Sequence, residues 1–195
     1  MAEKRTDRRT LKTRKALCDA LAELLATKEL HKVTVQEIAD KADVNRVTFY
    51  KHYLDVYDLY DKIEQDVLVE LGLLVLRLEE LPPEKFFSHL IEYVDENRPV
   101  FRMIFSPNST GQLREKFAKC MEGLYRQLEA EKQNSDPNGD KLRFQTCYRA
   151  QGCIAVMAQW VQGGFTEPRD FIAKIISELD TNTGKYITAS QKTKR

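Results

Sequence analysis

Along most of the chain, apolar residues recur every three or four positions and are separated by short polar breaks. This period is typical of amphipathic helices, whereas the alternation expected of strands is absent. Glycine occupies only 8 of the 195 positions. The pattern therefore predicts an all-α protein. We expect its helices at 8–27, from Thr34 onward, after Asn45, and at 55–78, 84–96, 99–105, 110–132, 140–163 and 167–180.

Residues 34–53 have the pattern of two short helices joined by a tight turn. Thr34 and Glu37 have the spacing of a capping box, in which a hydroxyl and a carboxylate each satisfy a backbone N–H at a helix start. Asn45 is a good cap for the second helix. The arrangement is that of a helix-turn-helix, which places its second helix in the major groove of DNA.

The distribution of charge supports this reading. The net charge is only +1, but residues 1–53 carry 12 Lys/Arg against 8 Asp/Glu, and residues 1–15 carry seven against two. A near-neutral chain with a basic front end indicates a nucleic-acid face and a body with another task. The body can bury a core, because 42% of the residues are hydrophobic. With no long apolar run and no secretory signal, we expect a cytoplasmic protein that does not enter membranes.

Enzymatic chemistry has no counterpart in the sequence. It contains no paired carboxylates in apolar context, no Gly-rich phosphate loop and no nucleophile elbow. The three histidines are scattered, and the four cysteines show no metal-ligand spacing. We therefore expect no enzyme, no metal and no cofactor, and we interpret the cysteines as free buried thiols.

The run V-Q-E-I-A-D-K-A-D-V-N-R-V-T-F-Y-K-H-Y, followed by D-V-Y-D-L, resembles the TetR family of bacterial regulators over about residues 8–65. A weaker likeness lies in A-Q-W-V-Q-G-G-F-T-E-P-R-D-F near the C-terminus. The resemblance implies a homodimer with a three-helix DNA-binding head, joined by a long helix to a helical body that binds an effector and dimerises through its last two helices. It divides the chain into a DNA-binding domain (1–54), a ligand-binding and dimerisation domain (55–180) and a flexible tail (181–195).

Two positions depart from the family pattern. Asp43 stands where the turn usually has glycine, although aspartate tolerates the left-handed conformation. Val56 stands where a lysine usually contacts phosphate, so one phosphate anchor is expected to be missing. The run F-Y-K-H-Y-L-D-V-Y-D-L is also similar to a subgroup resembling the activator of dihydroxyacetone-kinase operons, which works through a protein coactivator.

Several side chains are candidates for contact with DNA. Arg46 has the fork that matches guanine O6 and N7, although a phosphate contact is an alternative, and Val47 could pack on a thymine methyl. The remaining candidates for the groove or its flanking phosphates are Thr34, Asn45, Thr48, Tyr50, Lys51 and His52. Possible backbone contacts on the N-terminal arm are Arg8, Arg9 and Lys12. Phe49 and Tyr53, four positions apart, are expected in the core.

The body offers candidates for two further sites. Aromatic and methionine side chains that could line an effector pocket, or could simply form core, are Phe87, Tyr93, Met103, Phe117, Met121, Tyr125, Tyr148 and Trp160. Few charges fall among them, which favours an apolar or mildly polar effector. Candidates for the dimer interface are Phe144, Ile154, Met157, Phe171, Ile175 and Leu179.

The sequence thus predicts a transcription regulator that binds double-stranded, palindromic operator DNA. The leading hypothesis is a homodimeric repressor that a small-molecule effector releases from its operator. The alternatives are an activator working with a protein coactivator and a chromosome-organising factor without a small-molecule ligand.

Overall fold

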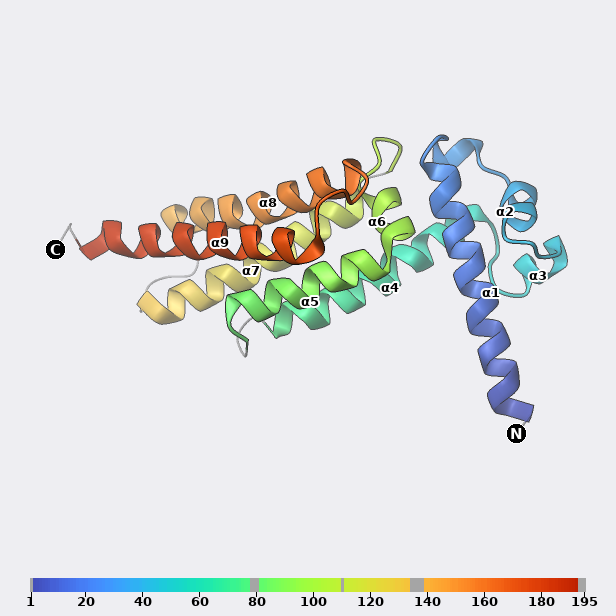
Figure 1. The fold of residues 1–195 in the computed structure, drawn as a ribbon, viewed down its shortest axis with the longest axis horizontal. Coiled ribbons are helices and arrows are strands. Elements are labelled where there is room, and N and C mark those ends of the chain that lie inside the picture. Colours follow the sequence, from blue (N-terminus) through green and yellow to red (C-terminus); the bar gives the residue numbers. More distant parts are fainter. Residues whose placement is uncertain (1, 78–80, 110, 134–138, 193–195) are drawn as a thin grey trace. The chain divides into compact units, whose positions relative to one another are not determined.

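The computed structural model describes the backbone of residues 2–77, 81–109, 111–133 and 139–192, and the side chains of these residues except at 2–7, 132–133 and 186–192. Within these residues the chain forms nine α-helices and one short 3-10 turn (Figure 1). The predicted all-α fold is confirmed. None of the described helices is long and apolar enough to cross a lipid bilayer.

The chain forms two compact units. Unit 1 comprises Met1–Val67 and Asn97–Gly111, and unit 2 comprises Leu68–Glu96 and Gln112–Arg195. The chain therefore passes between the units at three points, the first of them inside a continuous helix. Compactness does not say which residues bind DNA or an effector, so the functional division at residues 54 and 180 stays a prediction.

Unit 1 is built on helix α1 (Ala2–Leu25), against which α2 (Val35–Lys41) and α6 (Arg98–Ile104) pack. Helix α3 (Arg46–Tyr50) packs on α2, and α4 (Val56–Leu76) begins in this unit. A 3-10 turn at Leu30–Lys32 follows α1, in a stretch where the sequence predicted no helix. Fully buried apolar side chains of the unit include Leu17, Leu21, Leu25, Ile38, Phe49 and Leu59.

The C-terminal end of α1 is tied to the segment that follows α6. The carbonyl of Leu25 accepts hydrogen bonds from Ser106 Oγ and from Asn108 Nδ2, both at 3.3 Å. Carbonyls in the last turn of a helix have no partner within the helix, so distant side chains complete this end. Segment 97–111 is thereby fastened to the helix on which unit 1 is built.

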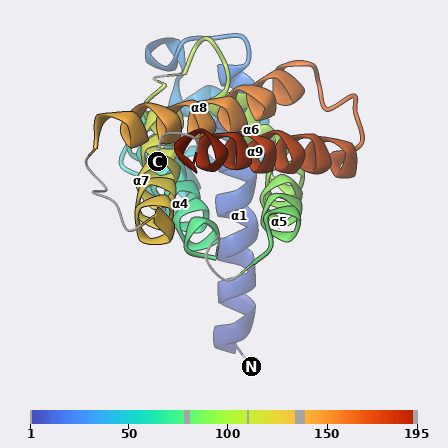
Figure 2. The same ribbon diagram turned by 90° about the vertical axis from the view of Figure 1, so that its left-hand side faces the viewer.

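Unit 2 contains the second part of α4 together with α5 (Pro83–Glu96), α7 (Gln112–Gln133), α8 (Asp140–Gln162) and α9 (Arg169–Lys192). α5 packs against α9, α7 packs against α8, and α8 lies beside α9 (Figure 2). Large buried side chains of this unit include Phe86, Phe87, Leu90, Ile91, Met121 and Trp160.

The observed helices lie close to the predicted ranges, with three differences. α1 begins at Ala2 instead of residue 8. Pro83 is the first residue of α5, one position before the predicted start at residue 84, consistent with the preference of proline for a first helical turn. α9 continues to Lys192, through most of the predicted flexible tail at 181–195. An established helix extends at little cost, and the Thr183 hydroxyl bonds to the carbonyl of Leu179 at 2.7 Å. Leu78, the last residue of the predicted helix 55–78, lies outside the described residues.

The residues that carry the C-terminal likeness form the turn between α8 and α9. Gly164 has a φ of +82°, which glycine adopts without strain. The Trp160 indole N–H donates to the carbonyl of Glu167 at 3.0 Å, and its ring meets Phe165 edge to face at 4.8 Å between centroids. The tryptophan therefore holds this turn closed.

A buried ionic cluster joins three helices of unit 2. Arg149 on α8 forms two hydrogen bonds with Asp180 on α9, at 3.0 and 2.9 Å, and one with Glu129 on α7 at 3.0 Å. Its guanidinium lies 4.1 Å from the centroid of the Tyr125 ring. Burial by itself would lower the pKa of Arg149, but the hydrogen bonds and charge of Asp180, together with the charges of Tyr125 and Glu129, hold the pKa above its ordinary value. Burial raises the pKa of the neighbouring Cys153 thiol to about 12, so this thiol is neutral.

We predict that Asp180→Ala destabilises unit 2 strongly. The side chain of Asp180 is 2% exposed, and its removal leaves Arg149 with one carboxylate partner instead of two. Breaking a buried ion pair costs about 3 kcal/mol of unfolding free energy or more. Urea unfolding followed by the fluorescence of Trp160, the chain's single tryptophan, measures the loss.

The matched control is Glu178→Ala on the same helix, whose ion pair with Lys174 is exposed. Its loss should stay within about 0.5 kcal/mol. Equal losses in the two variants would show that the buried cluster does not hold α9 in place.

Candidate nucleic-acid interface

The predicted capping box at the start of α2 is confirmed. The Thr34 hydroxyl accepts from the backbone N–H of Glu37 at 3.3 Å, and the Glu37 carboxylate accepts from the backbone N–H of Thr34 at 3.1 Å. Lys28 bonds to the same carboxylate and lowers the pKa of Glu37, as do the bonds from Thr34. The Thr34 side chain is thus engaged as a helix cap. The ionised carboxylate of Glu37 beside it is paired with Lys28.

The turn between α2 and α3 contains the strained residue that the sequence predicted. Asp43 has a φ of +53°, in the left-handed region. The backbone N–H of Asp43 bonds to the carbonyl of Asp40 at 3.2 Å, and that of Val44 to the carbonyl of Ala39 at 3.0 Å. These bonds close the end of α2 and direct the chain into α3.

Helix α3 is fixed by one buried side chain and one cap. Asn45 is the N-cap, and its side-chain oxygen accepts from the backbone N–H of Val47 at 2.8 Å. Phe49 is 0% exposed, and its ring packs against the rings of Tyr50 and Tyr53 at 5.6 and 5.8 Å. The predicted core positions of Phe49 and Tyr53 are confirmed, and they determine which face of α3 points outward.

The outward face of α3 carries most of the predicted DNA-contacting residues. Asn45, Arg46, Val47, Tyr50 and Lys51 are exposed, and Thr48 and His52 are partly exposed. An exposed valine between an arginine and a threonine adds an apolar contact to a polar surface. Such a surface can both hydrogen-bond to base edges and pack on a thymine methyl.

Within this face, Arg46 and Tyr50 contact each other. Arg46 Nη2 donates to the Tyr50 hydroxyl at 3.0 Å, and the guanidinium carbon lies 5.4 Å from the centroid of the tyrosine ring. Arg46 and Tyr50 were each predicted to contact DNA, but no contact between them was predicted. Their spacing of four residues on one helix is the signal that could have found the pair.

A second interaction that the sequence analysis missed joins α1 to the end of the helix-turn-helix. Arg14 Nε donates to the Tyr53 hydroxyl at 3.3 Å, and the Arg14 guanidinium lies 3.7 Å from a carboxylate oxygen of Asp66 on α4. Burial raises the pKa of the nearby Cys18 thiol to about 11, so it is a neutral neighbour of this bond. The bond between Arg14 and Tyr53 links residues 39 positions apart, and no local sequence pattern reveals such a contact.

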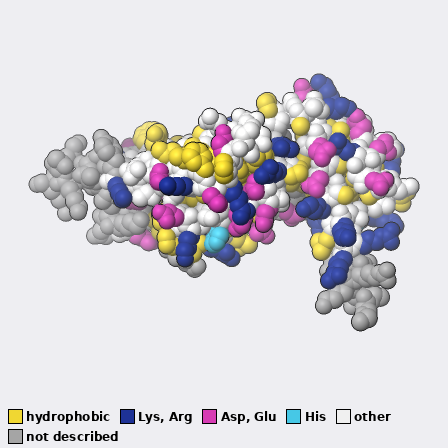
Figure 3. Space-filling model, in the orientation of Figure 1, with side chains coloured by type: hydrophobic (Ala, Val, Ile, Leu, Met, Phe, Trp, Pro, Cys, Tyr) yellow, Lys and Arg dark blue, Asp and Glu magenta, His cyan; other side chains and the backbone are white. Residues whose placement is uncertain are grey.

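The basic arm lies on α1. Arg8, Arg9 and Lys12 are exposed, and Lys and Arg side chains gather along the first half of this helix on the face shown in Figure 3. The sequence predicted a helix from residue 8, and the structure places these three residues on that helix. Their side chains can reach a phosphate backbone without rearrangement of the core.

The start of α4 is unsuited to a phosphate. Asp55 accepts from the backbone N–H of Asp58 at 2.8 Å, and Asp58 accepts from that of Leu54 at 2.9 Å. Val56, at the position of the family's lysine, is buried. One first-turn N–H of α4 is therefore already bonded to a carboxylate, and the negative charges of Asp55 and Asp58 disfavour a further anion there.

Comparison with known proteins gives this arrangement a family. A model described as "Bacterial regulatory proteins, tetR family" matches residues 17–61, which include α2, α3 and the start of α4. A model described as "Transcriptional regulator C-terminal region" matches residues 82–182, more than half of the chain. This chain belongs to the TetR family. It is a DNA-binding transcriptional regulator of the helix-turn-helix class, and the family is not one of enzymes.

Individual relatives agree with this assignment. The chain is 36% identical over 70 residues to an uncharacterised helix-turn-helix regulator, YxbF, of Bacillus subtilis (strain 168), and this stretch covers 35% of the chain and 18% of that protein. The chain thus spans less than a fifth of that relative's length.

Solved structures share the fold. A putative fatty acid metabolism regulator of Clostridium perfringens aligns with a TM-score of 0.63 at 21% identity, covering 86% of this chain and 96% of that one. The fatty acid degradation regulator FadR of Bacillus halodurans aligns at 0.62 and 17%, covering 86% and 94%. The dihydroxyacetone kinase operon activator DhaS aligns at 0.58 and 20%, covering 89% and 97%.

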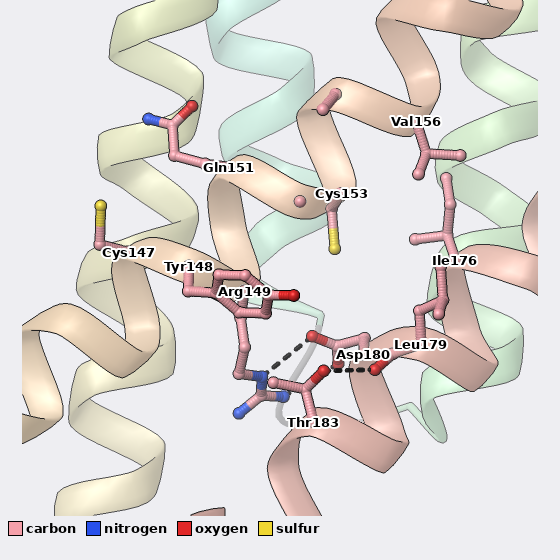
Figure 4. Close-up of a pocket in the computed structure, with 12 residues that line it drawn as sticks. Cys147, Tyr148, Arg149, Gln151, Cys153, Val156, Ile176, Leu179, Asp180 and Thr183 are labelled. Atoms are coloured by element: carbon pink, nitrogen blue, oxygen red, sulfur yellow. Dashed lines mark hydrogen bonds and ion pairs between the residues drawn. The ribbon is translucent and has the colours of Figure 1, made fainter.

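In the C-terminal part of this TetR-family chain, α8 and α9 present an apolar groove. The groove has a volume of about 400 Å³, and Tyr148, Val156, Ile176 and Leu179 are among its lining residues (Figure 4). Hydrophobic side chains gather over the same helices on the surface shown in Figure 3. Arg149 and Asp180 of the buried cluster form part of the groove's wall.

The structure separates the predicted interface residues into two groups. Phe144, Phe171 and Leu179 are exposed and Ile175 is half-buried. Ile154 and Met157 are buried, so their prediction as interface residues was wrong, because they already form part of the core of this chain. Both α8 and α9 carry apolar residues on a buried face and on an exposed face, and apolar character by itself did not distinguish the two faces.

The predicted effector-pocket residues are likewise divided. Phe87, Phe117 and Met121 are buried in unit 2 and Tyr93 there is half-buried, whereas Met103 belongs to unit 1. The other three have different positions or partners: Tyr125 lies against Arg149, Trp160 holds the α8–α9 turn, and Tyr148 is exposed in the α8–α9 groove. The interpretation of all four cysteines as buried thiols was wrong, because Cys120 is exposed and Cys18 and Cys147 are half-buried.

We predict that Asp43→Val destabilises the DNA-binding unit by about 1–2 kcal/mol, because a β-branched side chain is strained at a positive φ. Asp43→Asn should change stability by less than about 0.5 kcal/mol, since asparagine adopts this conformation readily. Urea unfolding followed by circular dichroism measures both variants. A valine variant as stable as the parent chain would show that the turn does not need the left-handed conformation.

Proposed function

We propose that this chain is a homodimeric repressor whose two heads bind a palindromic operator and which a small-molecule effector releases from DNA. The observation that carries the proposal is the exposed polar face of α3, which Phe49 fixes on the core of a TetR-family DNA-binding unit. A short, rigidly held helix with Arg46, Val47 and Tyr50 outward has the form that reads a major groove.

The proposed contacts divide into those that specify sequence and those that position the head. Arg46 reads a guanine and Val47 packs on a thymine methyl, while Thr48 and Tyr50 donate hydroxyl hydrogens to phosphates. The remaining positioning contacts are assigned to Thr34, Asn45, Lys51 and His52. On α1, Arg8, Arg9 and Lys12 track the phosphate backbone. The capped, acidic start of α4 contributes no phosphate contact, so the basic arm takes a larger share of the nonspecific affinity.

The proposed dimer forms through the outer faces of α8 and α9. Phe144, Tyr148, Phe171 and Leu179 are large apolar side chains exposed on these two helices. Apolar surface of this kind, gathered around a groove, is typical of an interface between subunits. In a twofold dimer the two α3 helices would meet successive major grooves, about 34–36 Å apart.

The proposed effector binds among the apolar side chains of unit 2, with Phe87, Phe117 and Met121 as candidate wall residues. Its chemistry is expected to be apolar or mildly polar. Binding would shift the population of dimers between DNA-competent and DNA-incompetent arrangements. α4 runs without interruption from unit 1 into unit 2. Segment 97–111 offers a second route, because Ser106 and Asn108 fasten it to the end of α1.

An activator that works with a protein coactivator is the alternative. The structural likeness to the activator DhaS, at 20% identity, shows a shared fold and does not determine the sign of regulation. The same likeness does not distinguish a repressor or an activator from a chromosome-organising factor without a ligand. The α3 surface serves all three, so measurements of DNA reading and dimerisation come before a search for an effector.

We predict that Arg46→Ala weakens binding to the preferred operator by at least about tenfold, because a bidentate arginine–guanine pair contributes about 1–3 kcal/mol of discrimination. Fluorescence anisotropy with labelled duplexes, at several salt concentrations, measures the affinity. Lys119→Ala removes the same charge from an exposed site on α7 and should leave affinity unchanged within about twofold. Undiminished binding by Arg46→Ala would contradict the proposed role of α3.

We predict that Leu179→Glu produces a monomer, because it places a charge in the centre of the proposed interface. The control is Leu73→Glu on α4, since Leu73 and Leu179 are similarly exposed, at 52% and 55%. Sedimentation velocity measures the oligomeric state. A dimer that survives Leu179→Glu but dissociates in Leu73→Glu would move the interface to α4.

A further inference from the structure

The hydroxyl of Tyr50 is placed to control the arginine beside it. The two residues are four apart on α3, which brings their side chains to one face of the helix. Arg46 Nη2 donates to Tyr50 Oη at 3.0 Å, so the tyrosine oxygen acts as an acceptor in this pair. Its own hydrogen remains available to a second acceptor, such as a phosphate oxygen. Tyr50 can therefore serve the arginine and the DNA backbone together.

The tyrosine is itself held by the core. Its ring meets the ring of Phe49 edge to face, with 5.6 Å between centroids and an interplanar angle of 85°. Phe49 is fully buried, so the Tyr50 ring is braced against a side chain that does not move independently of the unit. The hydrogen bond that Tyr50 accepts from Arg46 therefore holds an exposed guanidinium at a fixed distance from the core.

We propose that Tyr50 is a positioning residue that sets base discrimination by holding the Arg46 guanidinium in the orientation that reads guanine. This proposal rests on the proposed role of Arg46 as a base reader. An exposed arginine side chain has many rotamers and can turn to a neighbouring phosphate instead of a base. The bond to Tyr50 uses one of its five N–H donors and restricts the plane of the fork. Four donors remain, and two of them suffice for guanine O6 and N7.

This role differs in its consequences from a phosphate contact. If Tyr50 only donated to a phosphate, losing its hydroxyl would weaken binding to all DNA sequences by the same factor. If it also orients Arg46, the loss is larger for the preferred base pair than for the alternatives. Tyr50→Phe separates these roles, because it keeps the ring and its contact with Phe49 and removes only the oxygen.

The test uses the full-length chain and a duplex carrying its preferred site, together with duplexes in which each base pair of a half-site is replaced in turn. Affinities are measured for the parent chain, Arg46→Ala, Tyr50→Phe and the double variant. Arg46→Ala should abolish discrimination at one base-pair position. Tyr50→Phe should reduce discrimination at that same position by roughly fivefold, with discrimination elsewhere unchanged. The double variant should discriminate no less than Arg46→Ala, because the hydroxyl acts through the arginine.

Tyr57→Phe is the matched control. Tyr57 and Tyr50 have similar exposure, at 53% and 48%, and Tyr57 has no proposed contact with DNA. It should leave discrimination unchanged at every position. A Tyr50→Phe variant that weakens all duplexes equally, or that discriminates as the parent does, overturns the positioning role while Arg46 stays a base reader. Full discrimination by Arg46→Ala overturns the underlying assignment itself.

Discussion

The burial of Phe49 is the interaction on which the DNA-binding unit depends. Helix α3 has only five residues, far fewer than the roughly 12–15 that an isolated helix needs to be even marginally stable in water. It exists because Phe49 is fully buried, Asn45 caps its start, and the α2–α3 turn accepts a left-handed residue at Asp43. The same burial determines that Arg46, Val47 and Tyr50 face outward, so the chemistry of the recognition surface follows from one core contact.

Further bonds connect that contact to the rest of unit 1. Tyr53, whose ring packs on Phe49, accepts a hydrogen bond from Arg14 of α1, and the end of α1 is completed by Ser106 and Asn108. A displacement of segment 97–111 would therefore act on the helix that also supports α3. In unit 2 the buried Arg149 cluster fixes α9 to α7 and α8, which gives the outer apolar face of α8 and α9 a defined geometry.

The head could be predicted almost completely from the sequence, because its determinants are local. The Thr34–Glu37 box, the Asn45 cap and the four-residue spacing of Phe49 and Tyr53 each lie within one or two helical turns. The sequence did not reveal contacts between residues far apart along the chain, or which neighbour covers a given helix face. Arg14 and Tyr53 are 39 positions apart, and Arg149 and Asp180 are 31 apart. Ile154 and Met157 were placed at an interface because apolar periodicity identifies a buried face but does not say which neighbour covers it. The helical continuation of α9 past Thr181 was missed because a helix already formed can extend through residues that lack an apolar stripe.

Two copies of this head are proposed to read DNA as a symmetric pair, and the proposed function depends on this symmetry. In-vitro selection from a random duplex pool, using the full-length chain, tests it most directly. We expect an inverted repeat whose half-sites are equally enriched and whose centres are separated by about one helical turn, 10–10.5 base pairs, or a multiple of it. Enrichment of a single unrepeated half-site, or of no shared motif at all, would contradict the account.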